Sequence, residues 1–200
     1  MIQDMTFSQA CENNKKPILE QIKVVFTVPI TVWEIGSGTG QHGCFFAQHL
    51  PHIIWQPTDL PVNLSAISGR VKDSALNNIN PPLALDVRTR IWPDQCIEGL
   101  FTANTFHIMH WAMVVNCFEQ FTVNLKVGAS VVIYGPFNIN DQYTSESNAH
   151  FDQWLKLRDP QSGIRDVEDV VSLATSAGMI LKKNIAMPAN NQLLVFQKQR

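Results

Sequence analysis

Residues 31–43 read TVWEIGSGTGQHG and decide the fold of this 200-residue chain. An apolar run predicts a buried strand that ends at Gly36, and three more glycines follow within seven residues. Residues 41–50 have helical character. Glycine lets the backbone turn sharply and lets a ligand approach without a Cβ in the way. The stretch therefore predicts a strand, a glycine turn and a helix, with free backbone N–H groups at the positive end of that helix.

Two glycine patterns overlap in this stretch and favour different ligands. Counted from Gly38, the residues form GxGxxG, the pattern of dinucleotide-binding turns. Counted from Gly36, where the strand ends, they form GxGxG, and Gln41 stands where the third dinucleotide glycine belongs. Glu34 precedes the turn, and a buried carboxylate is costly unless it meets a cation or several donors. A plain turn beside a solvated Glu34 is the third interpretation.

Composition and charge restrict the class of protein. A length of 200 residues, 45% of them hydrophobic, suits one domain with a sizeable core. The net charge of −2 and the scattered basic residues argue against general binding to nucleic acid or to a membrane surface. Four cysteines without CxxC spacing indicate free thiols in a reducing compartment. With no signal peptide or membrane span in the sequence, we expect a cytoplasmic protein.

Helical and strand patterns alternate along the rest of the chain. The sequence predicts helices at residues 8–26, 64–76, 112–125, 147–157 and after Asp166, and strands at residues 53–59, 83–87, 99–103, 129–134, 180–187 and 192–197. This alternation predicts right-handed crossovers and a mainly parallel sheet. Residues 126–128 (KVG) predict a helix stop, and the polar stretch 137–165 predicts a lid or cap. Residues 188–191 (PANN) predict a hairpin that makes the last strand antiparallel.

Polar residues follow several of the predicted strands, at the sheet edge where ligands of such folds bind. Asp59 lies about twenty residues beyond the glycines, where an acid can accept both hydroxyls of a ribose. Asp86 ends the next strand, and Asn104 and His107 follow the strand after it. Asp59 supports an adenosine-containing ligand without choosing between NAD and S-adenosylmethionine; an aspartate that only caps a helix is the alternative.

The pattern acid-x-Gly-x-Gly-x-Gly from Glu34 resembles the opening of the site in class I S-adenosylmethionine (SAM) methyltransferases. SAM carries a sulfonium and an ammonium, which suits an acid near the turn. NAD enzymes also use an acid in the place of Asp59, but NAD folds typically lack the reversed last strand. The resemblance implies an α/β, Rossmann-like class I methyltransferase fold. Its seven-stranded sheet is mainly parallel with an antiparallel last strand, and helices cover both faces.

Beyond this superfamily, the chain resembles a one-domain, methyltransferase-like family known mainly as a domain of unknown function. The resemblance rests on motifs spread from end to end: NKKPILE (14–20), EIGSGTGQH (34–42), WQPTD (55–59), PLALDV (82–87), NTFHI (104–108), YGPF (134–137), TSESNAHFD (144–152), RDP (158–160), GIRD (163–166) and MPANN (187–191). It implies a single SAM-binding domain over residues 1–200, with the lid at 137–165, and supplies no substrate. Asn13 replaces a usual arginine, which puts an anion contact there in doubt. Gly43 replaces a usual alanine, which we expect to be harmless.

Under this resemblance, the cofactor-binding residues are Glu34, Gly36, Ser37, Gly38, Gly40, Asp59, Asp86, Val87 and Asn104. The glycines hold the amino-acid part of SAM, and Asp59 holds the ribose. Asp86 and Val87 meet the adenine, and Asn104 meets the methionine ammonium.

His107 is the candidate catalytic base, because it follows the fourth strand near the expected sulfonium; a packing histidine is the alternative. The spacing His107-x-x-His110 suggests a metal, but no third ligand is evident, so we expect no metal site. His42, His49 and His52 lie on or after the first helix of the glycine motif, and we expect them at the surface.

An amide-rich rim suits a small polar acceptor, and the candidates for it are Tyr134, Ser145, Asn148, Asp152, Asn190 and Asn191. The alternative is that Ser145 and Asn148 only cap the lid helix and that the asparagine pair only makes a turn. Arg158 and Arg165 are expected to pair with the aspartates that follow them and so to fix the lid.

Together these features predict a SAM-dependent methyltransferase that acts on an unidentified small polar molecule and yields S-adenosylhomocysteine. Alternatives are a non-catalytic SAM-binding module that serves a partner protein and, less favoured, an NAD-dependent oxidoreductase. We expect a small-molecule substrate and neither nucleic acid nor membrane as a partner. The sequence does not indicate the oligomeric state.

Overall fold

Helices and strands alternate along the chain in the computed structural model, which describes residues 7–89, 92–93 and 96–200. The chain divides into two compact units. The first unit contains residues 7–86 and 97–102, and the second contains residues 103–200 with the described part of 87–96. Each unit is built on strands with helices packed against them.

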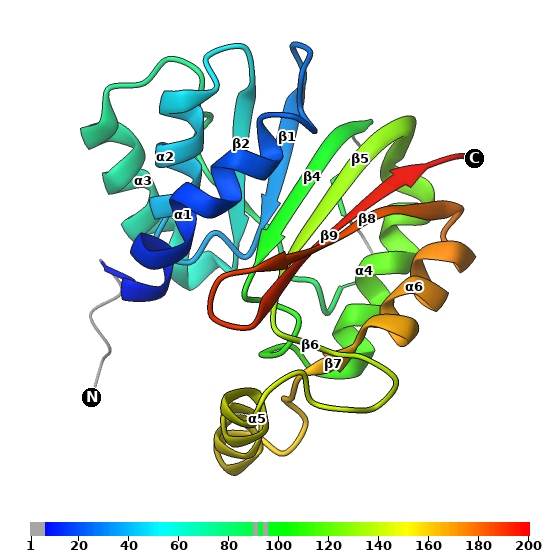
Figure 1. The fold of residues 1–200 in the computed structure, drawn as a ribbon. Helices are drawn as coiled ribbons and strands as arrows, with labels where there is room; N and C mark the ends of the chain where they lie inside the picture. The colour runs from blue at the N-terminus through cyan, green and yellow to red at the C-terminus, as the bar shows by residue number, and fades with distance from the viewer. Residues whose placement is uncertain (1–6, 90–91, 94–95) are drawn as a thin grey trace. The chain divides into compact units, whose positions relative to one another are not determined.

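The strands of the first unit are parallel and follow the order β3-β2-β1-β4. The strands are β1 (Thr31–Ile35), β2 (Ile54–Asp59), β3 (Leu83–Ala84) and β4 (Ile97–Ala103). The helices are α1 (Gln9–Ile22), α2 (Gln41–His49) and α3 (Leu64–Ser74), with a 3-10 turn, η1 (Pro61–Asn63), before α3. Figure 1 shows these elements in blue, cyan and green.

Aromatic rings fill the core between α2 and these strands. Phe46, Trp55 and Phe101 are fully buried, and their ring centroids lie 5.3 to 5.7 Å apart. Four of the five residues of β1 are buried. This is the burial expected for an inner strand of a parallel sheet, which is covered on both faces.

The second unit contains α4 (Trp111–Asn124), β5 (Leu125–Gly135), β6 (Phe137–Asn138), α5 (Glu146–Arg158), β7 (Arg165–Asp166), α6 (Val167–Ser176), β8 (Met179–Met187) and β9 (Asn191–Lys198). β9 runs antiparallel to both β5 and β8, while β6 and β7 form a small parallel pair of their own. Asp166 caps α6 by accepting from the Glu168 N–H. The antiparallel pairing of β8 with β9 confirms the predicted closing hairpin.

The full strand order is β3-β2-β1-β4-β5-β9-β8. This is the predicted fold class: an α/β fold with a seven-stranded, mainly parallel sheet in which the last strand of the chain, β9, is antiparallel to its neighbours β5 and β8. The reversed last strand was the feature that separates a methyltransferase-like fold from an NAD fold, and it is present.

Some predicted boundaries are wrong. Residues 126–128 do not stop α4; they belong to β5, because the buried Leu125 already has extended backbone angles and begins that strand. The strand predicted at 83–87 covers Leu83–Ala84 only, since its pairing with β2 ends at Asp59. The helix predicted at 8–26 ends at Ile22, and Pro17 lies inside it.

The polar stretch at 137–165 contains more regular structure than a loop. It holds α5, which Ser145 caps by accepting from the Asn148 N–H, and the two residues of β6. No helix among the described residues is long and apolar enough to cross a membrane.

Candidate functional site

The glycine turn (residues 36–40) joins β1 to α2 in the first unit. Gly36, Gly38 and Gly40 have φ angles of 70°, 56° and 72°, in a region that residues with a Cβ rarely adopt. A Cβ on Gly38 would meet no atom within 4 Å, so this residue has open space beside it. No side chain caps α2 after Gly40. The turn therefore leads into the positive end of α2, which favours an anionic group.

Asp59 ends β2, and its carboxylate accepts three hydrogen bonds. Oδ2 accepts from the Gly38 N–H at 2.6 Å. Oδ1 accepts from the Leu60 N–H and from Asn63 Nδ2, both at 2.7 Å. A carboxylate offers about four acceptor positions, so Asp59 holds the turn and keeps one position for another donor. The structure thus brings Asp59 and the glycine turn together.

Ser37 fixes the turn between β1 and β2. Its N–H donates to the Thr58 carbonyl at 3.0 Å, and its hydroxyl accepts from the Thr58 N–H at 3.1 Å. The Thr58 hydroxyl donates to the Glu34 carbonyl at 2.8 Å. Ser37 is buried, so its side chain supports the backbone of the turn.

Glu34 is a buried acid in β1 beneath the first turns of α2. Its Oε2 accepts from Trp55 Nε1–H at 3.0 Å, and the residue is 2% exposed. Burial raises the pKa of the Glu34 carboxyl to about 7, and the neighbouring Asp59 charge adds to this effect. A Cβ on Gly43 would lie 2.9 Å from Glu34 Oε2 and from the Trp55 ring. Glycine at position 43 is therefore needed for this packing, and alanine there would not be harmless.

The remaining cofactor candidates are Asp86, Val87 and Asn104. Asp86 is half-buried in the first unit, whereas Val87 and Asn104 belong to the second. Asn104 has a φ of 58°, and its N–H donates to the Tyr134 carbonyl at 2.9 Å. Asparagine tolerates this left-handed conformation, and such conformations concentrate at functional sites.

His107 is buried in the second unit, with 5% of its surface exposed. Its ring meets the edge of Phe151 with centroids 5.3 Å apart, and its carbonyl accepts from the Gly163 N–H at 2.9 Å. Burial lowers the pKa of His107 to about 4, and the Arg165 charge adds to this effect. The imidazole is therefore neutral at physiological pH, the form that a general base requires.

Asp152 is a buried carboxylate on α5, held by three neighbours in the second unit. Its Oδ2 accepts from the Tyr143 hydroxyl at 2.7 Å and pairs with Lys156 Nζ at 2.6 Å. Its Oδ1 accepts from the Ile164 N–H at 2.7 Å. These bonds join α5 to the residues just before β7.

Asn148 and Asn190 lie together. Asn148 Nδ2 donates to the Asn190 carbonyl at 3.0 Å and to the Thr144 hydroxyl at 2.9 Å. Ser145 caps α5, and Asn191 Nδ2 donates to two carbonyls of its own turn. The contacts of Ser145 and Asn191 have the form of the helix cap and the turn in the alternative interpretation, whereas the bond from Asn148 to Asn190 joins α5 to the hairpin before β9.

The last acceptor candidate, Tyr134, is buried in β5.

The predicted arginine pairs are wrong. The Arg158 guanidinium lies 4.5 Å from the centroid of the Trp154 ring, and Arg165 donates to backbone carbonyls near His107. Asp159 instead pairs with His110, with 2.8 Å between Oδ2 and Nε2. Among residues 7–89, 92–93 and 96–200, no three His, Cys, Asp or Glu side chains gather in a way that could hold a metal ion.

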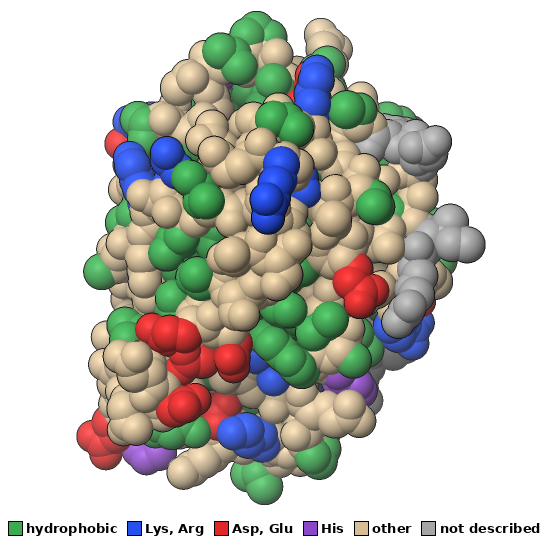
Figure 2. Space-filling view, turned by 90° about the vertical axis from the view of Figure 1, so that its right-hand side faces the viewer, with side chains coloured by type: hydrophobic (Ala, Val, Ile, Leu, Met, Phe, Trp, Pro, Cys, Tyr) green, Lys and Arg blue, Asp and Glu red, His purple; other side chains and the backbone are tan. Residues whose placement is uncertain are grey.

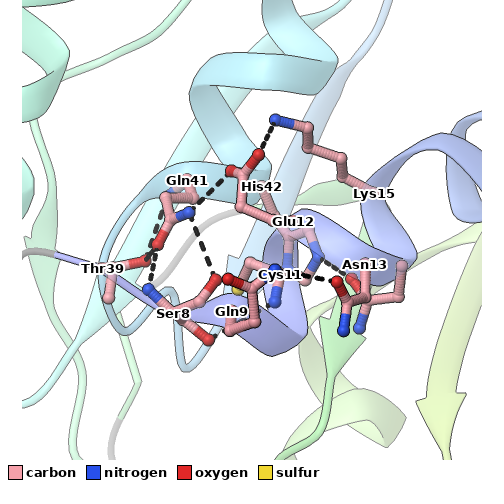
Figure 3. Close-up of polar contacts among 10 residues, drawn as sticks. Ser8, Gln9, Cys11, Glu12, Asn13, Lys15, Thr39, Gln41 and His42 are labelled. Atoms are coloured by element: carbon pink, nitrogen blue, oxygen red, sulfur yellow. Dashed lines mark hydrogen bonds and ion pairs between the residues drawn. The ribbon is translucent and has the colours of Figure 1, made fainter.

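Two features of the structure had no counterpart in the sequence analysis. Gln41 received no role and His42 was expected at the surface, yet both are buried, and Figure 3 shows their side chains among residues of α1. In the second unit, a cavity of about 230 Å³ is lined by Trp111, Asn138, Asp141, Ile164, Arg165, Asp166 and Asp169. The motifs EIGSGTGQH (34–42) and GIRD (163–166) contain some of these residues, but neither motif predicts the two features, because each depends on which element packs beside the residue.

Residues 5–198 match the family model described as "Protein of unknown function (DUF938)". The chain belongs to the DUF938 family. Since the match covers nearly the whole chain, both units of this DUF938 protein lie within it.

Solved structures share the fold of this DUF938 chain at low sequence identity. An O-methyltransferase family protein from Burkholderia thailandensis has a TM-score of 0.80 and 16% identity, covering 95% of this chain and 57% of that one. The S-adenosylmethionine-dependent methyltransferase SibL, in its apo form, has a TM-score of 0.81 and 18% identity, covering 96% and 56%. PigF with SAH has a TM-score of 0.81 and 13% identity, covering 95% and 56%. The chain thus spans little more than half the length of these proteins.

Proposed function

We propose that this protein is a SAM-dependent methyltransferase that acts on a small polar molecule and releases S-adenosylhomocysteine. One observation carries the proposal: the glycine turn after β1 is bonded through the Gly38 N–H to the carboxylate of Asp59, at the end of β2. In open α/β sheets, ligands bind at the carboxyl ends of the strands. SibL, which is a SAM-dependent enzyme, and PigF, which is described with SAH, share the fold.

The residues of the first unit fit SAM. The positive end of α2 suits its carboxylate. Asp59 has one acceptor position left for a ribose hydroxyl, and the bond from the Asn63 side chain can be exchanged for a second. A nearby cation lowers the pKa of an acid, so bound SAM would keep Glu34 ionised. By motif resemblance, Asp86 and Val87 meet the adenine, and Asn104 meets the ammonium.

When bound, SAM supplies a methyl group on a positively charged sulfur. The protein's main contribution is alignment in a dry site, which can supply about 7–11 kcal/mol. A base adds roughly 10²- to 10⁴-fold, and only for an acceptor that must lose a proton. We assign that role to the neutral imidazole of His107. The polar residues assigned to the acceptor are Tyr134, Ser145, Asn148, Asp152, Asn190 and Asn191.

A non-catalytic SAM-binding module is the second candidate, and the internal bonding of the second unit favours it. Asp152 already has three partners, and Ser145 and Asn191 serve a helix cap and a turn. Side chains engaged in this way leave few groups for an acceptor.

An NAD-dependent oxidoreductase is disfavoured by the antiparallel pairing of β9 with β5 and β8. Nucleic acid is disfavoured as a partner by charge. Figure 2 shows basic side chains scattered over the face that it draws, while acidic side chains gather in one area of that face. A basic stripe is the electrostatic footprint of a nucleic-acid-binding protein.

Isothermal titration calorimetry with SAM, S-adenosylhomocysteine and NADH tests the cofactor. We expect saturable binding of the first two and none of NADH. Asp59→Asn should weaken S-adenosylhomocysteine binding at least tenfold, because a charged acceptor for ribose is lost; Asp73→Asn, an exposed acid on α3, is the control. If neither SAM nor S-adenosylhomocysteine binds the wild type, the proposal fails. Turnover against a panel of small polar metabolites separates an enzyme from a binding module.

A further inference from the structure

The side-chain amide of Gln41, the first residue of α2, uses all of its hydrogen-bonding capacity. Its Oε1 accepts from the Ser8 N–H at 2.5 Å and from the Thr39 hydroxyl at 2.8 Å. Its Nε2 donates to the Ser8 carbonyl at 3.3 Å and to Glu12 Oε1 at 2.8 Å. A primary amide has two donors and two acceptor positions. The neighbours also fix its orientation, because the Ser8 N–H requires an acceptor and the Glu12 carboxylate requires a donor.

These four bonds join two segments that are distant in sequence. Thr39 lies inside the glycine turn, while Ser8 caps α1 and Glu12 lies in its first turn. Figure 3 shows the Gln41 side chain between Thr39 and the residues of α1, with a dashed line to each segment. Gln41 is only 6% exposed, although the first residue of a helix is commonly solvated. The glycine turn is thus tied to the start of α1 by one buried amide.

His42 strengthens the same connection. Its Nε2 lies 2.6 Å from Asn14 Oδ1, and its Nδ1 lies 3.7 Å from Cys11 Sγ. Burial lowers the pKa of His42 to about 4, so the ring is neutral at physiological pH. Because Asn14 Oδ1 can only accept, Nε2 carries the hydrogen, and Nδ1 is left to accept from the thiol. The first two residues of α2 therefore both contact α1.

The two halves of α1 are held in different ways. Ile18 and Ile22, in its second half, are fully buried. Its first half docks through the polar contacts of Gln41 and His42. Protein hydrogen bonds replace bonds to water at a modest net gain, so the first half is the part of α1 that opens most easily.

We infer that Gln41 is a positioning residue of the cofactor site: its amide latches the first turn of α1 to the glycine turn and holds that turn in its binding shape. The inference rests on the proposed function, because it assigns the glycine turn to SAM. Coupling between two sites is reciprocal. Ligand binding at the turn therefore also stabilises the latch.

The test combines calorimetry with hydrogen exchange on the full chain. Gln41→Glu keeps the size of the side chain but places an acceptor against the Ser8 carbonyl and the Glu12 carboxylate. We expect it to weaken S-adenosylhomocysteine binding about tenfold and to speed amide exchange over residues 9–13. In the wild type, S-adenosylhomocysteine should slow exchange over the same residues, and Gln41→Glu should abolish that protection.

Two further variants separate positioning from a general loss of folding. Glu12→Ala breaks the latch from α1, outside the glycine turn, and should weaken binding in the same direction. The double variant Glu12→Ala/Gln41→Ala should weaken S-adenosylhomocysteine binding by less than the sum of the two single effects. Both substitutions disrupt the same hydrogen-bond network, so their effects are not additive. Gln48→Glu, on the exposed side of α2, is the matched control and should leave binding and exchange unchanged. Circular dichroism checks that each variant keeps its helix content.

The outcomes distinguish this inference from the proposed function. If the wild type binds S-adenosylhomocysteine and Gln41→Glu binds it equally well, the positioning role is wrong and the proposed function stands. The proposed connection between Gln41 and the first turn of α1 is also refuted if amide hydrogen exchange over residues 9–13 is equally fast in Gln41→Glu and in the wild type. If the wild type binds neither SAM nor S-adenosylhomocysteine, the proposed function fails, and the inference fails with it.

Discussion

Replacing Glu34 with glutamine should stabilise the protein above neutral pH. Burial raises the Glu34 pKa to about 7 in the folded chain, from its ordinary value of 4.5. Between these two values the folded state binds a proton that the unfolded state has lost. The stability that this group contributes is therefore complete below pH 4.5 and is lost as the pH rises through 7. Glutamine keeps an oxygen that can accept from Trp55 Nε1–H and carries no charge.

The pKa difference sets the size of the effect. Each pKa unit corresponds to about 1.36 kcal/mol, so ionising Glu34 in the folded state costs about 3 kcal/mol once the pH exceeds 8. About 1 kcal/mol of this is already lost at pH 5. The free energy of unfolding of Glu34→Gln, minus that of the wild type, should therefore rise by about 2 kcal/mol between pH 5 and pH 8.

Urea unfolding followed by circular dichroism at pH 5, 6.5 and 8 measures this difference. His42 and His107 have lowered pKa values, so they destabilise the fold as the pH falls; they occur in both proteins, and the subtraction removes their effect. Glu119→Gln, which changes an exposed acid on α4, is the matched control for the substitution. A flat curve for Glu34→Gln, or a variant less stable than the wild type at pH 8, would refute the assignment of a buried, protonated acid.

Three further predictions concern the turn and the second unit. Gly38→Ala should cost about 1–2 kcal/mol of stability, because the φ angle of 56° is strained for alanine even though the space beside it is open. Gly69→Ala, at an open position in α3, should instead stabilise the protein by up to about 1 kcal/mol. Thermal unfolding of the two variants measures both effects. Asp152→Ala should destabilise by about 1–3 kcal/mol in urea unfolding, because it leaves the buried Ile164 N–H without its acceptor. If His107 is the base, kcat/KM should show no histidine inflection between pH 6 and pH 8, since burial lowers its pKa to about 4; an inflection that disappears in His107→Gln would contradict this.

The features predicted correctly from the sequence are those that local chemistry dictates. Gly36, Gly38 and Gly40 adopt positive φ because the chain must reverse between a buried strand and a helix, and glycine does so without strain. The hairpin at 188–191 follows from apolar runs on both sides of a turn sequence. Asp59 meets the turn because parallel neighbours bring their carboxyl ends to one edge. Each of these depends on a short segment or on the strand beside it.

The errors lie where a residue had a choice of partners that only tertiary packing resolves. Arg165 was expected to pair with the adjacent aspartate, but backbone carbonyls near His107 satisfy its guanidinium. The Asp166 carboxylate is buried and accepts from the N–H groups of Asp141 and Glu168, so the two charged groups each have backbone partners instead of one another. Residues 126–128 combine a basic residue with glycine, which indicates a helix stop. In the structure β5 already begins at the buried Leu125, so residues 126–128 lie in that strand.

The latch at Gln41 shows why polar contacts of this kind escape sequence reasoning. Periodicity identifies the apolar face of α1 through Ile18 and Ile22, and so predicts that the helix is docked, but not what its first turn meets. Ser8, Glu12 and Gln41 are each ordinary residues for a helix start, where solvation is the usual outcome. They become a network only because α1 packs beside α2, and a fully bonded amide then specifies one arrangement of the two helices. The glycine turn can be predicted from the sequence. The contacts that support its shape cannot, because they come from a helix about thirty residues earlier.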